Sequence, residues 1–538
     1  MFDENAVIAK PGQSVSRNSG ENFTLVLPSP RCFVDSHSHI ENGACAPLPL
    51  LWNQAIVLRL LKPDRMVIDD LATHGAFGLL FNVFQGRAGK LQVKPTNEIG
   101  NSFIGVIDQT FEAKSDLGKS EHYKYSDLFS CAVIMTMDME YAHIAGYNGQ
   151  TIYHEDEAKW YYYERQIGNV PENKGKKLQL LSESQKSFSK WWKQLFETIK
   201  AVKENPFRII PMYHFDPRRW NYSKTTQLDP NFQKGPWHHP LDKVASKKNK
   251  GLYIGIKMYP SLGYKPLDKR LPYLHDPKDG GCFYGQCMSE GIPILTHCSP
   301  GGMTTHEIKY YLEHDNPPSQ VQHPSHSSDT PPDAASTSCE QEGKAIKYFY
   351  DNYVHPRAWR EVLKKYRNLK LCLAHFGGDL FPEGPDNDWI KEIIDLINEF
   401  PNVYTDISCW NLDKNKEIFK GLLLNKKFDY LQDRILFGTD WYMTLLALGG
   451  KSYQTYCEEF YEFFNKIPGG RDLWIRLTFL NPFEFYGFHD KAVIDNLNNA
   501  LKDVKADGAK REANYELLCR LQKEYESQRK RLEKYKKA

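Results

Sequence analysis

Six side chains that can bind a metal ion or move a proton stand at or near the ends of short apolar runs. In chain order they are His37, His39, Lys257, His297, His375 and Asp440. His37 and His39 are two residues apart, so on a strand both imidazoles point to one face and can chelate the same ion. Imidazole and carboxylate ligands suit Zn²⁺ best, with Mn²⁺, Fe²⁺ or Ni²⁺ able to use the same ligands. The set therefore predicts a divalent metal site with one or two ions.

Eight short apolar runs, each ending in polar residues, carry these side chains. They span residues 32–39, 131–138, 208–214, 252–259, 292–298, 369–375, 403–408 and 435–440. Segments of helical character separate the runs, and apolar strands that alternate with helices predict parallel βα units. Eight such units predict an α/β fold with a closed (β/α)8, TIM-like barrel, in which the active site lies where the strands end.

Alternation along each run predicts which side chains face the barrel interior. In the fourth run Lys257 faces inward, whereas Ile256 faces the covering helices; in the eighth run Asp440 faces inward and Phe437 outward. A single histidine on an apolar strand is usually structural. The ordered combination of four histidines, a lysine and an aspartate indicates function, because unpaired polar groups at a barrel mouth cost free energy.

Three connections are too long for simple crossovers and predict insertions in the βα loops, at about residues 41–129, 141–205 and 302–345. The Pro/Ser-rich part of the last one, 315–343, predicts a loop that is either an inert insertion or a lid. The expected division of the chain is an N-terminal extension over 1–31, the barrel over 32–488, and a charged C-terminal helical tail over 489–538. Charges alternate in the tail at helical spacing, which predicts a helix or hairpin packed on the barrel or on another subunit.

The overall composition excludes several classes of protein. The chain has 538 residues, of which 41% are hydrophobic and 25% charged, so it can bury a large core. A net charge of +2 offers no bulk attraction to nucleic acid or to an anionic membrane. The 11 cysteines include no CxxC pair, and the sequence shows neither a secretory signal nor a membrane-spanning apolar stretch. We therefore expect a cytoplasmic protein that binds neither nucleic acid nor a membrane.

The order HxH, Lys, His, His, Asp resembles the amidohydrolase superfamily of metal-dependent hydrolases. The local sequences VDSHSH, GIKMYPSLGYKP, IPILTHCSPGG and RILFGTDW are similar to its amidohydrolase-2 branch. The resemblance covers about residues 32–489, apart from the long insertions. It implies a hydrolase that uses a metal-activated water on an amide, cyclic amide, lactone or related carbonyl substrate.

The resemblance also implies roles for the six residues. His37, His39 and Asp440 would form the more buried metal site, and His297 and His375 the second. Asp440 would take a proton from the water and later pass it to the leaving group, while the metal, or His297 in a site with one ion, polarises the scissile carbonyl.

The sequence is less specific about the roles of three further residues, and each of them has two interpretations. The sequence IKMYP around Lys257 resembles that of the carboxylated lysine in dihydroorotases; alternatively Lys257 stays an ammonium that binds a substrate carboxylate or pairs with Asp440. Arg218 follows the third run and could hold a substrate carboxylate, or form a loop ion pair. Tyr259, at the end of the fourth run, is either a substrate-binding or a structural residue.

Other functions use the same pattern of residues. A non-oxidative decarboxylase of this superfamily would bind its substrate directly to one metal. A metal-dependent deoxyribonuclease would typically carry a glutamate where this chain has Lys257, and would need a basic groove. A non-catalytic barrel with an assembly role is the third alternative, and the insertions or the C-terminal helices could also support a homo-oligomer.

Overall fold

The computed structural model describes eleven segments of the chain. These are residues 32–40, 96–111, 129–138, 189–217, 238–268, 271–276, 282–300, 347–441, 443–444, 448 and 451–537. The predicted N-terminal extension, the Pro/Ser-rich segment 315–343 and Arg218 lie outside the described residues.

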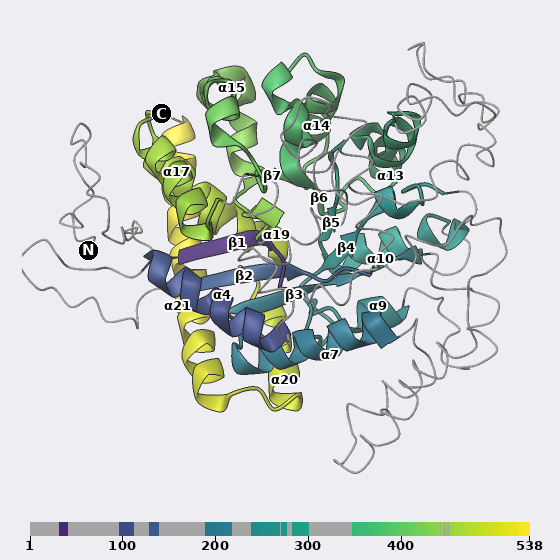
Figure 1. Cartoon of the computed structure of the whole chain (residues 1–538), viewed down its shortest axis with the longest axis vertical. Helices are drawn as coiled ribbons and strands as arrows, with labels where there is room; N and C mark the ends of the chain where they lie inside the picture. Colours follow the sequence, from purple (N-terminus) through teal and green to yellow (C-terminus); the bar gives the residue numbers. More distant parts are fainter. Residues whose placement is uncertain are drawn as a thin grey trace, which may run out of the picture.

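Eight parallel strands form one sheet in sequential order, β1 to β8 (Figure 1). They are β1 Cys32–Ser38, β2 Phe129–Met135, β3 Ile209–His214, β4 Ile256–Met258, β5 Ile294–Thr296, β6 Leu371–Leu373, β7 Val403–Asp406 and β8 Ile435–Leu436. Seven of the predicted apolar runs contain one of these strands, and the run 131–138 overlaps β2, which begins two residues earlier. All their residues are buried, as expected for parallel strands covered by helices on one side and closed around a core on the other. The predicted TIM-like barrel is confirmed.

The barrel closes between β1 and the segment that follows β8. Ser36 N–H donates to the carbonyl oxygen of Phe437 at 2.9 Å, and Asp440 N–H donates to that of His37 at 2.6 Å. A parallel bridge between Ser38 and Trp441 extends the contact. The backbone on either side of Asp440 is therefore hydrogen-bonded to the segment that carries His37 and His39.

Helices cover the outside of the barrel (Figure 1). They are α4 Thr96–Phe111, α7 Ser189–Glu204, α9 His238–Asp242, α10 Phe283–Glu290, α13 Arg360–Lys365, α14 Asp388–Glu399, α15 Leu412–Leu424, α17 Tyr453–Asn465, α18 Gly470–Ile475 and α19 Asn481–Tyr486. Helices α4 and α7 pack against each other although both fall in ranges expected as insertions, so part of each range is a crossover helix. No helix in the described part of the chain is long and apolar enough to cross a membrane.

Side-chain directions in the strands follow the predicted alternation. The Phe437 ring packs against Trp474 of α18, with centroids 5.2 Å apart, and so faces the covering helices. The next residue, Gly438, faces inward: a Cβ added there would lie 2.8 Å from the Cβ of His37. Because a larger residue would push β1 away, glycine at this position permits the close approach of the two strands.

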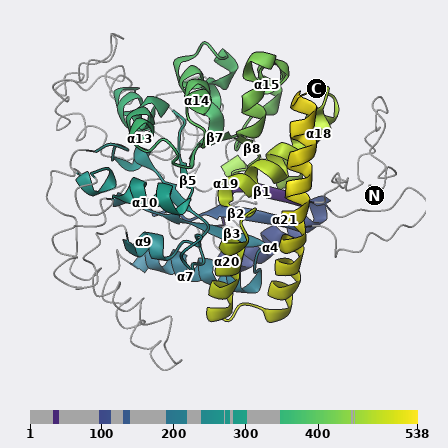
Figure 2. The ribbon, with the colours of Figure 1, turned by 180° about the vertical axis from the view of Figure 1, so that it is seen from behind.

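Two helices follow the barrel at the C-terminal end of the chain, α20 Lys491–Asp503 and α21 Gly508–Lys537. They run side by side and α21 contacts β2 and the helical turn Arg476–Leu480 (Figure 2). The leucines spaced along their sequence are buried, namely Leu497, Leu501, Leu517, Leu518 and Leu521. The predicted C-terminal helical extension is confirmed, and it packs on the barrel of its own chain. The division of the chain into three domains stays a prediction.

The buried leucines of α21 should stabilise the barrel. Leu518 is fully buried, so Leu518→Ala should lower the free energy of unfolding by about 2–5 kcal/mol through lost contacts and a residual cavity. Chemical denaturation monitored by circular dichroism measures this change. Arg520→Ala, on the exposed side of the same helix, should leave the transition nearly unchanged. Equal transitions for the two variants would show that α21 does not contribute to the stability of the barrel.

Candidate metal centre

Three predicted ligands lie together at the closure of the barrel. The Asp440 Oδ1 atom is 3.1 Å from His39 Nε2 and 3.6 Å from His37 Nε2. All three side chains are buried, and their ligand atoms lie within 4.8 Å of one another. Two ligands bound at about 2.1 Å in a tetrahedral zinc site stand roughly 3.4 Å apart, so the spacing fits one small divalent cation. The donor set of two imidazoles and a carboxylate also suits such an ion.

The other two predicted histidines lie beside this triad. His375 Nε2 is 3.2 Å from His297 Nδ1, and the His375 ring centroid is 5.0 Å from that of His37. Both residues are buried and belong to the ends of β6 and β5. The structure therefore brings all four predicted histidines into one cluster, as convergence of the C-terminal strand ends requires.

Lys257 and Tyr259 complete the cluster from the end of β4. The fully buried Lys257 Nζ lies 3.4 Å from His37 Nε2 and 5.2 Å from the centroid of the Tyr259 ring. The Tyr259 ring stacks on His297, with centroids 4.6 Å apart and planes inclined by 11°. Tyr259 thus touches a predicted ligand, and its predicted role in substrate binding stays a prediction.

Asp406 and Ser408, at the end of β7, belong to the site although nothing in their local sequence marks them as functional residues. His37 Nδ1–H donates to Asp406 Oδ2 at 3.0 Å, and Ser408 Oγ–H donates to Asp406 Oδ1 at 2.5 Å. Ser408 Oγ in turn lies 2.9 Å from His375 Nδ1. These bonds occupy the Nδ1 atoms of both histidines and leave their Nε2 lone pairs directed at the other ligands. Asp406 therefore positions the histidines.

Burial and neighbouring charges set the protonation of the triad. Burial, with the positive charge of Lys257, lowers the pKa of His37 to about 4, so this imidazole is neutral at pH 7. Burial alone would raise the pKa of Asp440, but the hydrogen bond from His39 and the nearby histidines hold it well below its usual range. A neutral imidazole beside an ionised carboxylate is the state that binds a cation.

Four residues that follow β6, β7 and β8 adopt left-handed backbone conformations. They are His375, Phe376, Cys409 and Asp440, with φ of 69°, 41°, 57° and 54°. Each such conformation costs a non-glycine residue on the order of 1–3 kcal/mol and persists where the surroundings determine it. Hydrogen bonds hold two of these turns: the Trp410 indole N–H donates to the His375 carbonyl at 2.7 Å, and Thr439 N–H donates to Asp35 Oδ1 at 3.0 Å. Two of the four strained residues, His375 and Asp440, are therefore proposed ligands.

Comparison with known proteins finds relatives of part of the chain. Residues 352–455 match the family model described as Amidohydrolase. The matched segment contains His375, Asp406 and Asp440. The predicted resemblance to the amidohydrolase superfamily is confirmed by this match, which supports a hydrolase enzyme. The search of curated proteins found no match.

Three similar solved structures have low sequence identity to the chain. A protein provisionally named 2-pyrone-4,6-dicarboxylic acid hydrolase from Acinetobacter baumannii, with citric acid bound, is 12% identical with a TM-score of 0.29, covering 54% of this chain and 78% of that one. An uncharacterised TIM-barrel protein from Bordetella bronchiseptica is 14% identical with a TM-score of 0.29, covering 54% and 71%. A provisionally named metal-dependent hydrolase from Lactobacillus casei is 13% identical with a TM-score of 0.34, covering 85% and 96%.

The hydrogen bonds of Asp406 lead to a prediction about metal affinity. Asp406→Asn should weaken zinc binding about 10–100-fold, because the amide holds His37 and His375 less firmly in the ligating tautomer. Competition with a chromogenic chelator measures the affinity, and circular dichroism checks the fold. Asp413→Asn, at an exposed position at the start of α15, is the matched control and should bind zinc normally. Normal affinity in the folded Asp406→Asn variant would remove its positioning role.

Proposed function

We propose that this protein is a metal-dependent hydrolase of small molecules that contain an amide, cyclic amide, lactone or related carbonyl group. The observation that carries the proposal is the spacing of His37 Nε2, His39 Nε2 and Asp440 Oδ1 at the closure of the barrel. The family match over residues 352–455 supports the same class of reaction. The strand ends of a TIM-like barrel are also where such enzymes keep their active sites.

The donor set suggests which ion the protein takes and which residues hold it. His37, His39 and Asp440 would hold a divalent cation, for which zinc is the best fit to two imidazoles and a carboxylate. His297 and His375 offer ligand atoms for a second ion. When bound, the cation supplies Lewis-acid polarisation of a carbonyl oxygen and lowers the pKa of a water molecule toward neutrality.

Two side chains at the centre would transfer a proton and orient the substrate carbonyl. Asp440 is ionised, buried and next to two histidines, so its free carboxylate oxygen can accept a proton and return it to the leaving group. His297 is held by the stacked Tyr259 ring, and in a site with one ion it would orient the substrate carbonyl through a hydrogen bond. The buried walls of the cluster exclude bulk water, which strengthens these interactions.

The number of metal ions at the site depends most on the chemical state of Lys257. Its amine is fully buried, and the neutral form of a lysine amine is the one that captures CO₂. We propose that Lys257 is carboxylated in the metal-loaded protein, where the carbamate would replace an ammonium with an anionic oxygen ligand. The distance of 3.4 Å between Lys257 Nζ and His37 Nε2 places the group within the ligand cluster.

Two measurements test the proposed function: the metal content of the purified protein and the turnover of the Asp440→Asn variant. Purified protein should contain one or two equivalents of zinc by elemental analysis, and Asp440→Asn should lower turnover by about 10²–10⁴-fold. Turnover is measured on a panel of N-acyl amides, cyclic amides and lactones, with metal content determined for each variant. Asp413→Asn should retain full activity. Failure to bind any supplied divalent metal would overturn the proposal, and CO₂ release without hydrolysis would indicate a decarboxylase.

The carboxylated lysine has a spectroscopic test. Protein reconstituted with zinc in ¹³C-bicarbonate should show a carbamate carbon signal by NMR that disappears in Lys257→Ala. Lys370 is a second largely buried lysine, outside the ligand cluster, whose amine donates to the carbonyl of Glu484 at 2.9 Å. The Lys370→Ala variant should keep the signal. A signal that survives in Lys257→Ala, or that is absent from the zinc-loaded wild type, contradicts carboxylation at Lys257.

A further inference from the structure

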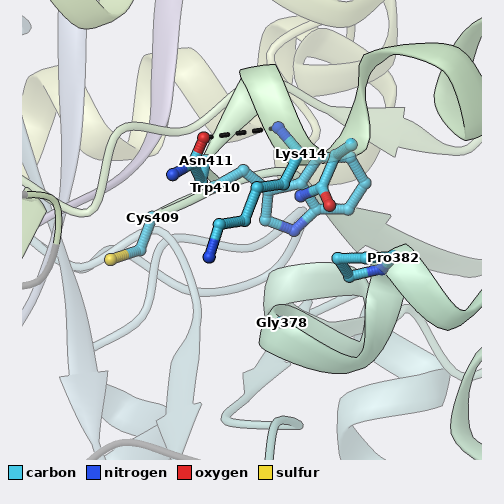
Figure 3. A pocket seen from close by; sticks show the side chains of 7 residues that line it. Gly378, Pro382, Cys409, Trp410, Asn411 and Lys414 are labelled. Carbon is cyan, nitrogen blue, oxygen red and sulfur yellow. Dashed lines mark hydrogen bonds between the residues drawn. The ribbon is translucent and has the colours of Figure 1, made fainter. Parts of the chain in front are cut away.

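A pocket lies beside the metal centre, between the segments that follow β6 and β7. Its volume is about 200 Å³, and its walls include Gly378, Pro382, Trp410 and Lys414 (Figure 3). This volume is below the roughly 300–1,000 Å³ of pockets that enclose whole drug-sized ligands. The pocket therefore suits one end of a small molecule.

The pocket is connected to the metal centre through the backbone. Its wall residue Cys409 directly follows Ser408, whose hydroxyl lies 2.9 Å from His375 Nδ1. Trp410 donates its indole N–H to the carbonyl oxygen of His375, and Gly378 stands three residues after that histidine. The walls of the pocket are therefore formed by the same two loops that carry His375 and Ser408.

Asn415 gives the pocket a buried polar group that lacks a partner. Its side chain lines the pocket and is only 3% exposed, and Asn415 Oδ1 has no hydrogen-bond partner among the described residues. Leaving a buried acceptor unpaired costs free energy, and a ligand hydroxyl or N–H group would recover it. A ligand that carries a hydrogen-bond donor would therefore satisfy Asn415 Oδ1.

Lys414 supplies positive charge at the same place. It is the one residue of the pocket lining with a full charge, and no ion pair involves its amine within the described part of the chain. Figure 3 shows its side chain running from the start of α15 toward Cys409. The pocket also lies at the N-terminal end of this 13-residue helix, where the backbone dipole favours negative charge. The acidic neighbour Asp413 is highly exposed and lies 4.0 Å from Lys416.

We propose that this pocket binds the carboxylate end of the substrate. Lys414 pairs with the carboxylate, Asn415 Oδ1 accepts a hydrogen bond from a hydroxyl or amino group beside it, and the Trp410 ring packs against the apolar remainder. The inference rests on the proposed function and narrows it: the substrate class is a hydroxy- or amino-substituted carboxylic acid that carries the hydrolysable carbonyl bond at its other end. We call the seven lining residues the carboxylate pocket; they are Gly378, Pro382, Cys409, Trp410, Asn411, Lys414 and Asn415.

Three matched probes test separately how the carboxylate charge and the hydroxyl donor of a ligand contribute to its binding. Mandelate carries a carboxylate and a hydroxyl, mandelamide carries the hydroxyl without the charge, and phenylacetate carries the charge without the hydroxyl. Isothermal titration of the full-length protein should show that mandelate binds most tightly. Lys414→Gln should weaken mandelate and phenylacetate at least fivefold and leave mandelamide unchanged. Asn415→Leu should weaken mandelate and mandelamide and leave phenylacetate unchanged.

Control variants separate this proposal from the proposed function. Lys416→Gln removes the same charge from the same helix outside the pocket lining and should leave binding of all three probes unchanged. Thermal melting confirms that each variant folds, and Asn415→Ala replaces Asn415→Leu if leucine is not accommodated. The dependence on Lys414 should persist in an Asp440→Asn background, so that a failure of hydrolysis does not count against the pocket.

Two results would overturn the carboxylate pocket. One is equal affinity for mandelate in Lys414→Gln and Lys416→Gln, which would place the carboxylate elsewhere, for example on the metal. The other is the absence of measurable binding of any probe to the wild-type protein at millimolar concentration. Detected hydrolysis of neutral substrates together with either result would leave the metal-dependent hydrolase in place without this pocket.

Discussion

The parallel contact that joins β1 to the segment after β8 is the constraint on which the site depends. His37 and His39 belong to one side of this contact and Asp440 to the other, more than 400 residues later in the chain. The backbone bond from Asp440 N–H to the His37 carbonyl sets the distance between the two sides, and Gly438 permits their close approach. The spacing of the proposed ligands is therefore a consequence of barrel closure.

The polar network behind the histidines gives the cluster its electrostatic character. Asp406 and Ser408 occupy the Nδ1 atoms of His37 and His375, so the Nε2 atoms face the ligand cluster. Burial opposes protonation of His37 while the surrounding histidines keep Asp440 ionised. The same low-dielectric surroundings that disfavour a proton on the imidazole strengthen the attraction of the site for a cation.

Aromatic packing supports the strained turns at the strand ends. Phe376, which follows His375 and also has a positive φ, stacks on Trp410 with centroids 5.8 Å apart. The centroid of the Phe381 ring lies 4.1 Å from that of the Trp410 ring, and all three rings are buried. Burial of these rings offsets the cost of the left-handed backbone. The Trp410 ring also lines the carboxylate pocket. The side chain that holds the His375 turn would therefore also contact the substrate.

Much of the fold was predictable because its signals are local. Apolar runs that end in polar residues predicted all eight strands, and side-chain alternation predicted that Lys257 faces inward and Phe437 outward, since each strand has a period of two. The crossover helices α4 and α7 were missed as barrel elements because long connecting sequence surrounds them and hides the regular spacing of βα units.

The site was predictable in composition but not in arrangement. The types and order of His37, His39, Lys257, His297, His375 and Asp440 could be chosen from the sequence, because each stands at or near the end of an apolar run. Asp406 stands near the end of such a run too, yet nothing local distinguishes a residue that orients a ligand from one that is a ligand. That distinction depends on which imidazole nitrogen the carboxylate meets, and the carboxylate pocket depends on how two loops lie together. Both are decided only when distant segments pack, because contacts across a barrel leave no periodic trace along the chain.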